Sequence, residues 1–148
     1  MKLKVDSRLA SVTKVRQQVR RFLTENSILS PDSIVLGDIL LAVTEALSNA
    51  VQHSVRPEEV FTVTAQVKEP TTFEFRLASI QNIDFRKLRK ENDSALDILS
   101  SNGRGLFLIE TLMDSVGYVP SATNPHTVEL VMHRYIGTDS APGGHHAI

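Results

Sequence analysis

The spacing of apolar positions predicts three helices. A second helix is expected to open at Ser30-Pro31-Asp32, where an N-cap serine precedes a proline, and to end at about His53. A third helix is expected to follow Gly105 and to end before Gly117. The first helix is expected from Ser7 to about Glu25, because apolar residues recur there at steps of three and four; they are Leu9, Val12, Val15, Val19, Phe22 and Leu23.

Alternation of polar and apolar residues predicts the strands. It runs from Val60 to Val67 and again from Phe73 to Leu77, and the turn Glu69-Pro70-Thr71 between them predicts a hairpin. Two further strands are expected at about Gly117 to Ala122 and Thr127 to Tyr135. This element order indicates an α+β fold, with one largely antiparallel sheet covered on one face by helices.

Two segments lack this regularity. Residues 80–102 show only a short helical pattern at Ala95–Leu99, and so long a loop in a compact domain is usually a lid or a binding segment. The tail, residues 137–148, has the composition of a flexible end. With 148 residues in total, the chain is expected to form one domain over residues 1–136.

Composition narrows the classes of function. The 16 Lys and Arg residues balance 17 Asp and Glu residues, whereas a sequence-independent nucleic-acid binder carries a basic excess. The chain has no cysteine, which excludes disulfides, thiolate nucleophiles and cysteine-based zinc sites. No stretch approaches the roughly 18 apolar residues of a membrane span. We therefore expect a cytoplasmic protein.

The first helix carries a basic face opposite its apolar one. This face could hold an acidic partner, although a solvated helix face is the commoner explanation. Contact with DNA or RNA is a further, less favoured alternative. The residues of the face are Lys14, Arg16, Gln17, Arg20 and Arg21.

The second helix aligns polar side chains of three chemical kinds. At about 100° per residue, Glu45, Asn49 and His53 fall within roughly 80° of one another, and Asp38 lies in the same arc. An exposed polar face without a role is the alternative explanation. An asparagine inside a helix is mildly unfavourable, which is weak evidence that it has a purpose.

A short glycine-containing segment precedes the third helix. In Asn102-Gly103-Arg104-Gly105, glycines allow backbone N–H groups to approach an anion, and a helix N-terminus adds partial positive charge. The segment therefore predicts a phosphate site. The alternative is that the glycines only shape a tight loop.

Two segments together resemble the GHKL ATPases, which have the Bergerat fold. Leu41-Ala42-Val43-Thr44-Glu45-Ala46-Leu47-Ser48-Asn49-Ala50-Val51-Gln52-His53 resembles their N box, and Gly103-Arg104-Gly105-Leu106-Phe107-Leu108-Ile109 their second glycine box. The most similar branch is the small anti-sigma-factor serine/threonine kinases of bacterial partner switching. The resemblance runs from the first helix to about Tyr135 and implies an α/β sandwich of three helices on a mixed, mostly antiparallel sheet.

The resemblance also implies roles for single residues. Glu45 matches the general base, and Asn49 matches the asparagine whose side-chain oxygen binds Mg²⁺. His53 is expected near the phosphates. Thr127 matches a threonine that helps to hold the adenine region. Residues 103–105 match the segment around the triphosphate of ATP, and residues 80–102 match the ATP lid.

The chain departs from this family at its first glycine box. Ser79 stands where the family has the aspartate that binds the adenine amino group, and Gln81 stands where it has a glycine. A hydroxyl in place of the carboxylate costs on the order of 1.5–3 kcal/mol of binding free energy. The residues that match the catalytic positions of the family, Glu45 and Asn49, are therefore kept, whereas the positions that contact adenine, Ser79 and Gln81, are altered.

Two functions follow as hypotheses. The first is an ATP- and Mg²⁺-dependent serine/threonine kinase that phosphorylates a small antagonist protein and regulates a sigma factor. The second is a non-catalytic module of the same fold that sequesters a sigma factor or another regulator without ATP. The resemblance also implies a homodimer.

Overall fold

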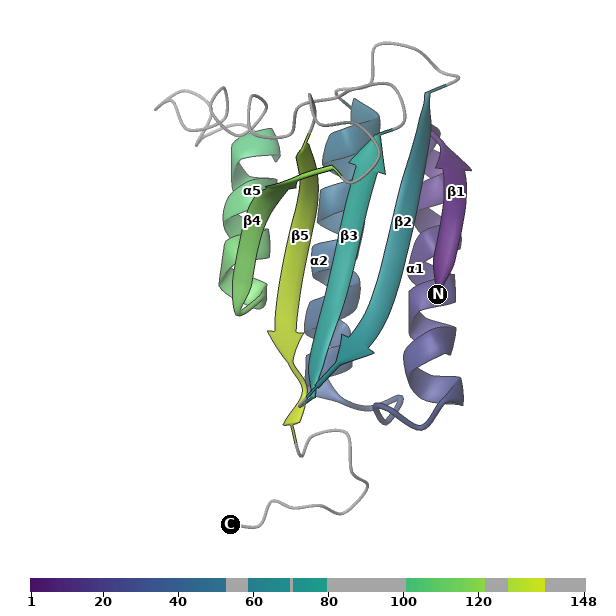
Figure 1. Ribbon diagram of the computed structural model, residues 1–148, viewed down its shortest axis with the longest axis vertical. Helices are drawn as coiled ribbons and strands as arrows, with labels where there is room; N and C mark the ends of the chain where they lie inside the picture. Colours follow the sequence, from purple (N-terminus) through teal and green to yellow (C-terminus); the bar gives the residue numbers. More distant parts are fainter. Residues whose placement is uncertain (53–58, 70, 80–100, 122–127, 138–148) are drawn as a thin grey trace.

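A five-stranded sheet forms one layer of the structure (Figure 1). The computed structural model describes residues 1–52, 59–69, 71–79, 101–121 and 128–137. Every strand pairing within these ranges is antiparallel, and the order across the sheet is β1-β2-β3-β5-β4. The strands are β1 (Lys2–Asp6), β2 (Val60–Lys68), β3 (Thr72–Ser79), β4 (Ser115–Pro120) and β5 (Val128–Tyr135).

Within the described ranges three helices cover one face of this sheet, and α2 lies between the other two (Figure 1). They are α1 (Leu9–Glu25), α2 (Ile34–Gln52) and α5 (Ser101–Leu112). The predicted α+β class is confirmed, and the sandwich is consistent with a Bergerat-type ATPase fold. The expectation of a mixed sheet is not met within the described residues, where all pairings are antiparallel.

The core lies between the two layers and follows the sequence periodicity. Alternate residues of β2 and β3 point toward the helices, as expected for a strand with a side-chain period of two. The large ones, Phe61, Phe73 and Phe75, are fully buried. Helix α2 contributes its apolar face to the same core, with Val35, Leu36, Ile39, Ala42, Val43, Ala46, Leu47 and Ala50 buried.

Helix α2 is also long and apolar enough to cross a membrane by length and composition, with a mean hydropathy of 1.7 over its most apolar stretch. The prediction that no stretch approaches a membrane span was therefore too strict. In this fold α2 is the central core helix, and it carries the charged residues Asp38 and Glu45. Its apolar residues are explained by their burial between the sheet and the neighbouring helices.

The hairpin of β2 and β3 is confirmed, with Lys68 opposite Thr72. The strands predicted from 117 to 122 and from 127 to 135 are present with shifted bounds, and α5 ends at Leu112, before Gly117, as predicted. The helical pattern at 95–99 and the tail at 138–148 lie outside the described residues.

Two features at the N-terminal side differ from the prediction. Helix α2 is capped by Ser33, whose hydroxyl accepts a 3.3 Å hydrogen bond from the N–H of Leu36, while Ser30 accepts from Asp32 in the preceding turn. Strand β1 was not predicted, because only Leu3 and Val5 alternate there and five residues give a weak periodic signal. Strand β1 is defined by its antiparallel pairing with β2, a contact between residues distant in the sequence that a local pattern cannot reveal.

Arg134 joins three elements at one end of the sandwich. Its Nη1 donates a 2.6 Å hydrogen bond to the carbonyl oxygen of Leu112, at the C-terminus of α5, and its Nη2 lies 3.1 Å from Oδ2 of Asp38 on α2. The last carbonyls of a helix lack intrahelical partners, and here one is satisfied by a cation. Both side chains are largely shielded, with 21% of Arg134 and 26% of Asp38 exposed.

Replacing Arg134→Met is expected to lower the free energy of unfolding by about 2 kcal/mol, because it leaves a shielded carboxylate and a helix carbonyl without their donor. Urea denaturation followed by circular dichroism measures this. The matched control is Arg21→Met, which breaks an ion pair with Glu25 that is more than 60% exposed on both sides and is expected to cost less than about 1 kcal/mol. Equal losses of unfolding free energy in the two variants would contradict a stabilising role for the contacts of Arg134.

Candidate functional site

Glu45 and Asn49 lie one turn apart on α2, and both are half-buried. The Nδ2 atom of Asn49 is buried and has no hydrogen-bond partner among the described residues. An unsatisfied buried amide is uncommon in folded proteins and calls for an explanation, such as a missing ligand. The pair therefore presents a carboxylate beside an amide that is free to bind another group.

Packing sets the direction in which this pair points. The buried face of α2 lies against the sheet. The polar stripe of Asp38, Glu45 and Asn49 therefore lies along one edge of that buried face. Asp38 belongs to that stripe and pairs with Arg134, which also holds the end of α5. Because residues 38, 45 and 49 share one arc of the helix, Glu45 and Asn49 lie on the side of α2 that faces α5.

Asp38 thus has a structural role, unlike Glu45 and Asn49 of the same predicted stripe. It lies near the N-terminal end of α2 and has a structural partner. Glu45 and Asn49 lie toward the C-terminal end. His53, the last member, lies outside the described residues, as do Gln81 and Thr127.

The other predicted site residues are placed by their backbones. Ser79 ends β3, where it pairs with Phe61. The C-terminal end of α2, the C-terminal end of β3 and the N-terminal end of α5 lie at the same end of the sandwich (Figure 1). The topology therefore brings together the elements that carry Asn49, Ser79 and Gly103.

The expected loop at Gly103, Arg104 and Gly105 is corrected by the structure. Helix α5 begins at Ser101, so these residues lie in its first turns. A glycine costs a helix roughly 1 kcal/mol relative to alanine, which is small enough to be tolerated. The first four N–H groups of a helix, counted from the residue before its first helical residue, have no intrahelical acceptor. In α5 this series ends at Gly103, whose N–H remains suited to an anion such as phosphate.

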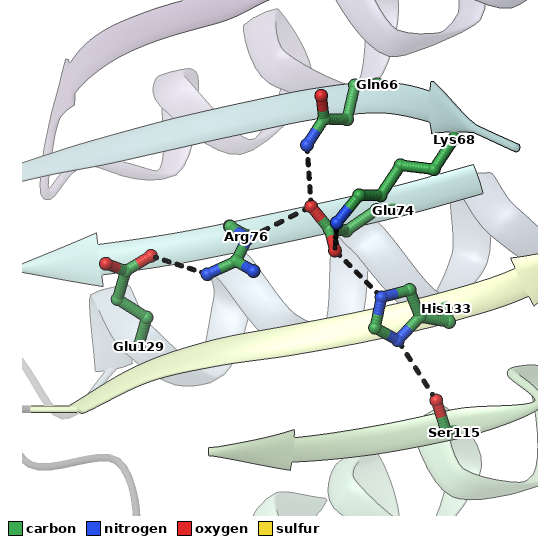
Figure 2. Close-up of polar contacts among 7 residues, drawn as sticks. All are labelled: Gln66, Lys68, Glu74, Arg76, Ser115, Glu129 and His133. Atoms are coloured by element: carbon green, nitrogen blue, oxygen red, sulfur yellow. Dashed lines mark hydrogen bonds and ion pairs between the residues drawn. The ribbon is translucent and has the colours of Figure 1, made fainter. Parts of the chain in front are cut away.

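The opposite face of the sheet carries a second polar cluster, which the sequence prediction missed (Figure 2). The Glu74 side chain is only 1% exposed, although it lies on the face without helices. Its carboxylate accepts four hydrogen bonds, from Gln66 Nε2 at 2.7 Å, His133 Nε2 at 2.8 Å, Arg76 Nε at 3.0 Å and Lys68 Nζ at 3.3 Å.

Strand register builds this cluster. Gln66, Glu74 and His133 are direct neighbours across β2, β3 and β5, and Ser115 of β4 lies opposite His133. A carboxylate only accepts hydrogen bonds, so His133 Nε2 carries the proton that it donates. The Nδ1 atom of the same ring lies 3.2 Å from Ser115 Oγ.

Burial alone raises the pKa of the Glu74 carboxyl, but the hydrogen bonds outweigh it and lower the pKa from 4.5 to about 2; the donors, in order of effect, are Arg76, Gln66, His133 and Lys68. The hydrogen bond between Glu74 and Arg76 also raises the pKa of the Arg76 guanidinium. A carboxylate so firmly held in its charged form is a poor proton acceptor. Glu74 is therefore a structural charge, and Glu45 is the better candidate for a base.

No group of three or more His, Asp or Glu side chains able to hold a metal occurs within the described ranges. This does not conflict with a Mg²⁺ site, because Mg²⁺ usually keeps several waters and takes only one or two protein ligands together with substrate phosphates. A single amide from Asn49 is compatible with that mode of binding.

The sandwich, the polar border of α2 and the helix N-terminus beside it define the architecture of an α/β-sandwich ATPase. Comparison with known families agrees: the histidine kinase-like ATPase domain family matches residues 5–133. The chain belongs to this family.

Three relatives share the same name, serine-protein kinase RsbW. The protein of Bacillus velezensis is 38% identical over 91 residues, which cover 55% of each chain. That of Bacillus subtilis is 32% identical over 111 residues, covering 68% of this chain and 65% of the relative. That of Oceanobacillus iheyensis is 30% identical over 112 residues, covering 70% and 68%. The chain thus spans between about half and two thirds of these relatives.

Glu74→Gln is expected to lower the free energy of unfolding at neutral pH by on the order of 3 kcal/mol. The pKa of Glu74 is lower in the folded protein, so its contribution is present above about pH 4.5 and is lost as the pH falls toward 2. The difference between wild type and variant should therefore shrink over that interval. Urea denaturation at a series of pH values measures it, with Glu25→Gln as the exposed control. A difference that stays constant with pH would contradict the cluster's role.

Proposed function

We propose that this protein is an ATP- and Mg²⁺-dependent serine/threonine protein kinase of the anti-sigma-factor type, which acts in the cytoplasm on a small antagonist protein. Membership of the histidine kinase-like ATPase family supports ATP as the cofactor. The relatives named serine-protein kinase support the reaction class. The observation that carries the proposal is the buried amide of Asn49, which has no partner among the described residues and lies one turn from Glu45.

The fit of Asn49 to Mg²⁺ rests on its amide. The oxygen and nitrogen of an asparagine side chain exchange places when the terminal bond turns by half a rotation, and their assignment follows the hydrogen bonds available. Because no group in the described part of the chain bonds to Nδ2, Asn49 can turn Oδ1 toward a cation. Mg²⁺ with ATP would supply a phosphoryl group whose charge is neutralised by the metal.

Glu45 is the residue that we propose to act on the incoming hydroxyl. Residues four apart on a helix have Cβ atoms roughly 5–6 Å apart, so the carboxylate lies beside the amide that is proposed to bind the metal. There it can orient the hydroxyl of a substrate serine or threonine and accept its proton. The N–H groups at the start of α5 are suited to hold the phosphates, and Arg104 adds a positive charge to that segment.

The remaining contacts belong to the same proposal. His53 is assigned to the phosphate side, and Ser79, Gln81 and Thr127 to the adenine side. A hydroxyl at Ser79 makes a weaker acceptor for the adenine amino group than a carboxylate. We therefore propose that metal and phosphate contacts provide most of the affinity for ATP.

The proposed partners are an antagonist protein, which receives the phosphoryl group, and a sigma factor, which is released or held according to the state of the antagonist. The proposed assembly is a homodimer.

Calorimetric titration with a non-hydrolysable ATP analogue, with and without Mg²⁺, tests the binding step. We expect Mg²⁺-dependent binding, which Asn49→Ala abolishes because it removes the metal ligand. Ser48→Ala, the adjacent residue on another face of α2, is the control and should bind like wild type. Absence of binding at millimolar nucleotide would refute the kinase and favour the non-catalytic module that sequesters a regulator.

Glu45→Gln tests the chemical step separately. We expect affinity for the nucleotide to stay within about twofold, while transfer of phosphate to the antagonist protein falls by roughly 10²–10⁴-fold, the usual contribution of a general base. Incorporation of labelled phosphate from ATP measures transfer. Unchanged transfer by this variant would show that Glu45 is not the base.

A further inference from the structure

Three side chains of the cluster on the open sheet face form a triad that ends at the surface (Figure 2). Ser115 Oγ lies 3.2 Å from Nδ1 of His133, and Nε2 of the same ring lies 2.8 Å from Oε2 of Glu74. Burial increases along the triad, because Ser115 is exposed, the His133 side chain is 34% exposed and the Glu74 side chain is 1% exposed. A hydroxyl, a base and a group that orients the base are the parts of an activated nucleophile.

The Glu74 carboxylate sets the direction in which this triad can move a proton. It only accepts hydrogen bonds, so the proton of the neutral His133 ring lies on Nε2. The lone pair of Nδ1 then faces the hydroxyl of Ser115, from which it can take a proton. The two ring nitrogens are used in the reverse of their order in the serine proteases, but the chemical roles of the three groups are the same.

Strand pairing holds the triad in place. Glu74 of β3 lies opposite His133 of β5, and His133 lies opposite Ser115 of β4. The carboxylate also accepts hydrogen bonds from three further side chains, so its charge is fixed where an imidazolium would form. A charge that is fixed before the reaction stabilises the charged intermediate without rearrangement.

The surroundings of Ser115 indicate the kind of group that fits there. The next residue of β4 on the same face is Gly117, where an added Cβ would meet no atom within 4 Å. Its partner on β5 is the apolar residue Val131. The ion pairs of the cluster join two carboxylates to two side-chain cations, so these charges balance. These features favour a small, uncharged acyl group.

We propose that Ser115 is a nucleophile that is acylated by small, uncharged, activated esters, with His133 as its base and Glu74 as a positioning residue. Oγ attacks the carbonyl carbon and forms a C–O bond, while its proton passes to Nδ1 of His133. The bond to the leaving alcohol or phenol then breaks, and the leaving group takes this proton. Water hydrolyses the acyl-serine by the same route, which releases a carboxylic acid and restores Ser115.

An activated ester is the appropriate substrate because its leaving group departs readily and requires little stabilisation of the oxyanion. The triad lies on the sheet face opposite the helices, whereas Glu45 and Asn49 lie on α2 (Figure 1). The reaction uses neither nucleotide nor metal, so this proposal does not rest on the proposed kinase function.

Hydrolysis of p-nitrophenyl butyrate and labelling by an alkyl fluorophosphonate test the proposal. In the labelling reaction a bond forms between Oγ and phosphorus, fluoride leaves, and the product is stable. We expect a single label at Ser115. Trypsin cleaves after Arg104 and Arg134 and releases residues 105–134 as one peptide, in which fragmentation by mass spectrometry locates the label.

Two variants and a matched control test the assignment of nucleophile and base. Ser115→Ala should remove the label and reduce ester hydrolysis to the rate in buffer. His133→Gln should slow both reactions at least tenfold, because the amide cannot act as a general base. Ser27→Gly removes another exposed serine, at a backbone φ of 56° that glycine adopts readily, and should keep both rates within about twofold.

The positioning role of Glu74 is tested by ¹⁵N NMR of the imidazole ring. In the wild type we expect the ring proton on Nε2. In Glu74→Gln the amide oxygen should stay with Gln66 and Arg76, which both bond to Oε1, so that the amide N–H faces His133. The ring proton should then move to Nδ1, and labelling should slow at least tenfold while circular dichroism shows that the fold is kept.

Each of the following results would overturn the proposal: a ring proton on Nδ1 in the wild type, a label at another residue, or labelling that His133→Gln leaves unchanged. Absence of both labelling and hydrolysis above the rate in buffer would do the same. ATP and Mg²⁺ are left out of every assay, so these outcomes can be distinguished from failure of the kinase proposal.

Discussion

Burial of the apolar face of α2 is the constraint on which the other features depend. Eight residues of this helix are buried, and they face the large side chains of the central strands. Burying apolar area contributes roughly 25 cal/mol per Å², and the interior is closely packed, so the rotation of α2 about its axis is fixed. Its two borders therefore differ, with Glu45 and Asn49 toward α5 and Gly37 and Leu40 toward α1.

The polar groups of the structure fall into satisfied and unsatisfied ones, and this difference separates structural from functional candidates. Glu74 accepts four hydrogen bonds and its pKa is lowered to about 2. Such a network stabilises the sheet because every member has a partner. The Nδ2 atom of Asn49 has none among the described residues, and an unpaired buried amide is stabilised by a ligand that completes it.

Helix α5 connects the two ends of the sandwich. Its C-terminus is held by Arg134, which also contacts α2 through Asp38. Its N-terminus lies at the same end as the C-termini of α2 and β3 (Figure 1). A fixed C-terminal end thus helps to place the N–H group of Gly103 beside the elements that carry Asn49 and Ser79, which is the position that the proposed phosphate contact requires.

The sequence by itself determined the features that depend on local spacing. Periodicity indicated three helices, the β2–β3 hairpin and the strands β4 and β5, and four-residue spacing placed Glu45 and Asn49 on one face. It missed β1, which has two alternating apolar residues, and it treated residues 103–105 as a loop, because glycine is typical of loops and the stabilising contacts of α5 are distant in sequence.

Only the tertiary structure decided which polar residues have partners. Asp38 and Arg134 are 96 positions apart in the chain, and Glu74 and His133 are 59 apart. Strand register and helix packing bring such residues together, and a local pattern contains no information on either. For the same reason the sequence indicated a basic face on α1, but only the packing of α1 against α2 showed that Arg16 and Arg20 line a groove between the two helices.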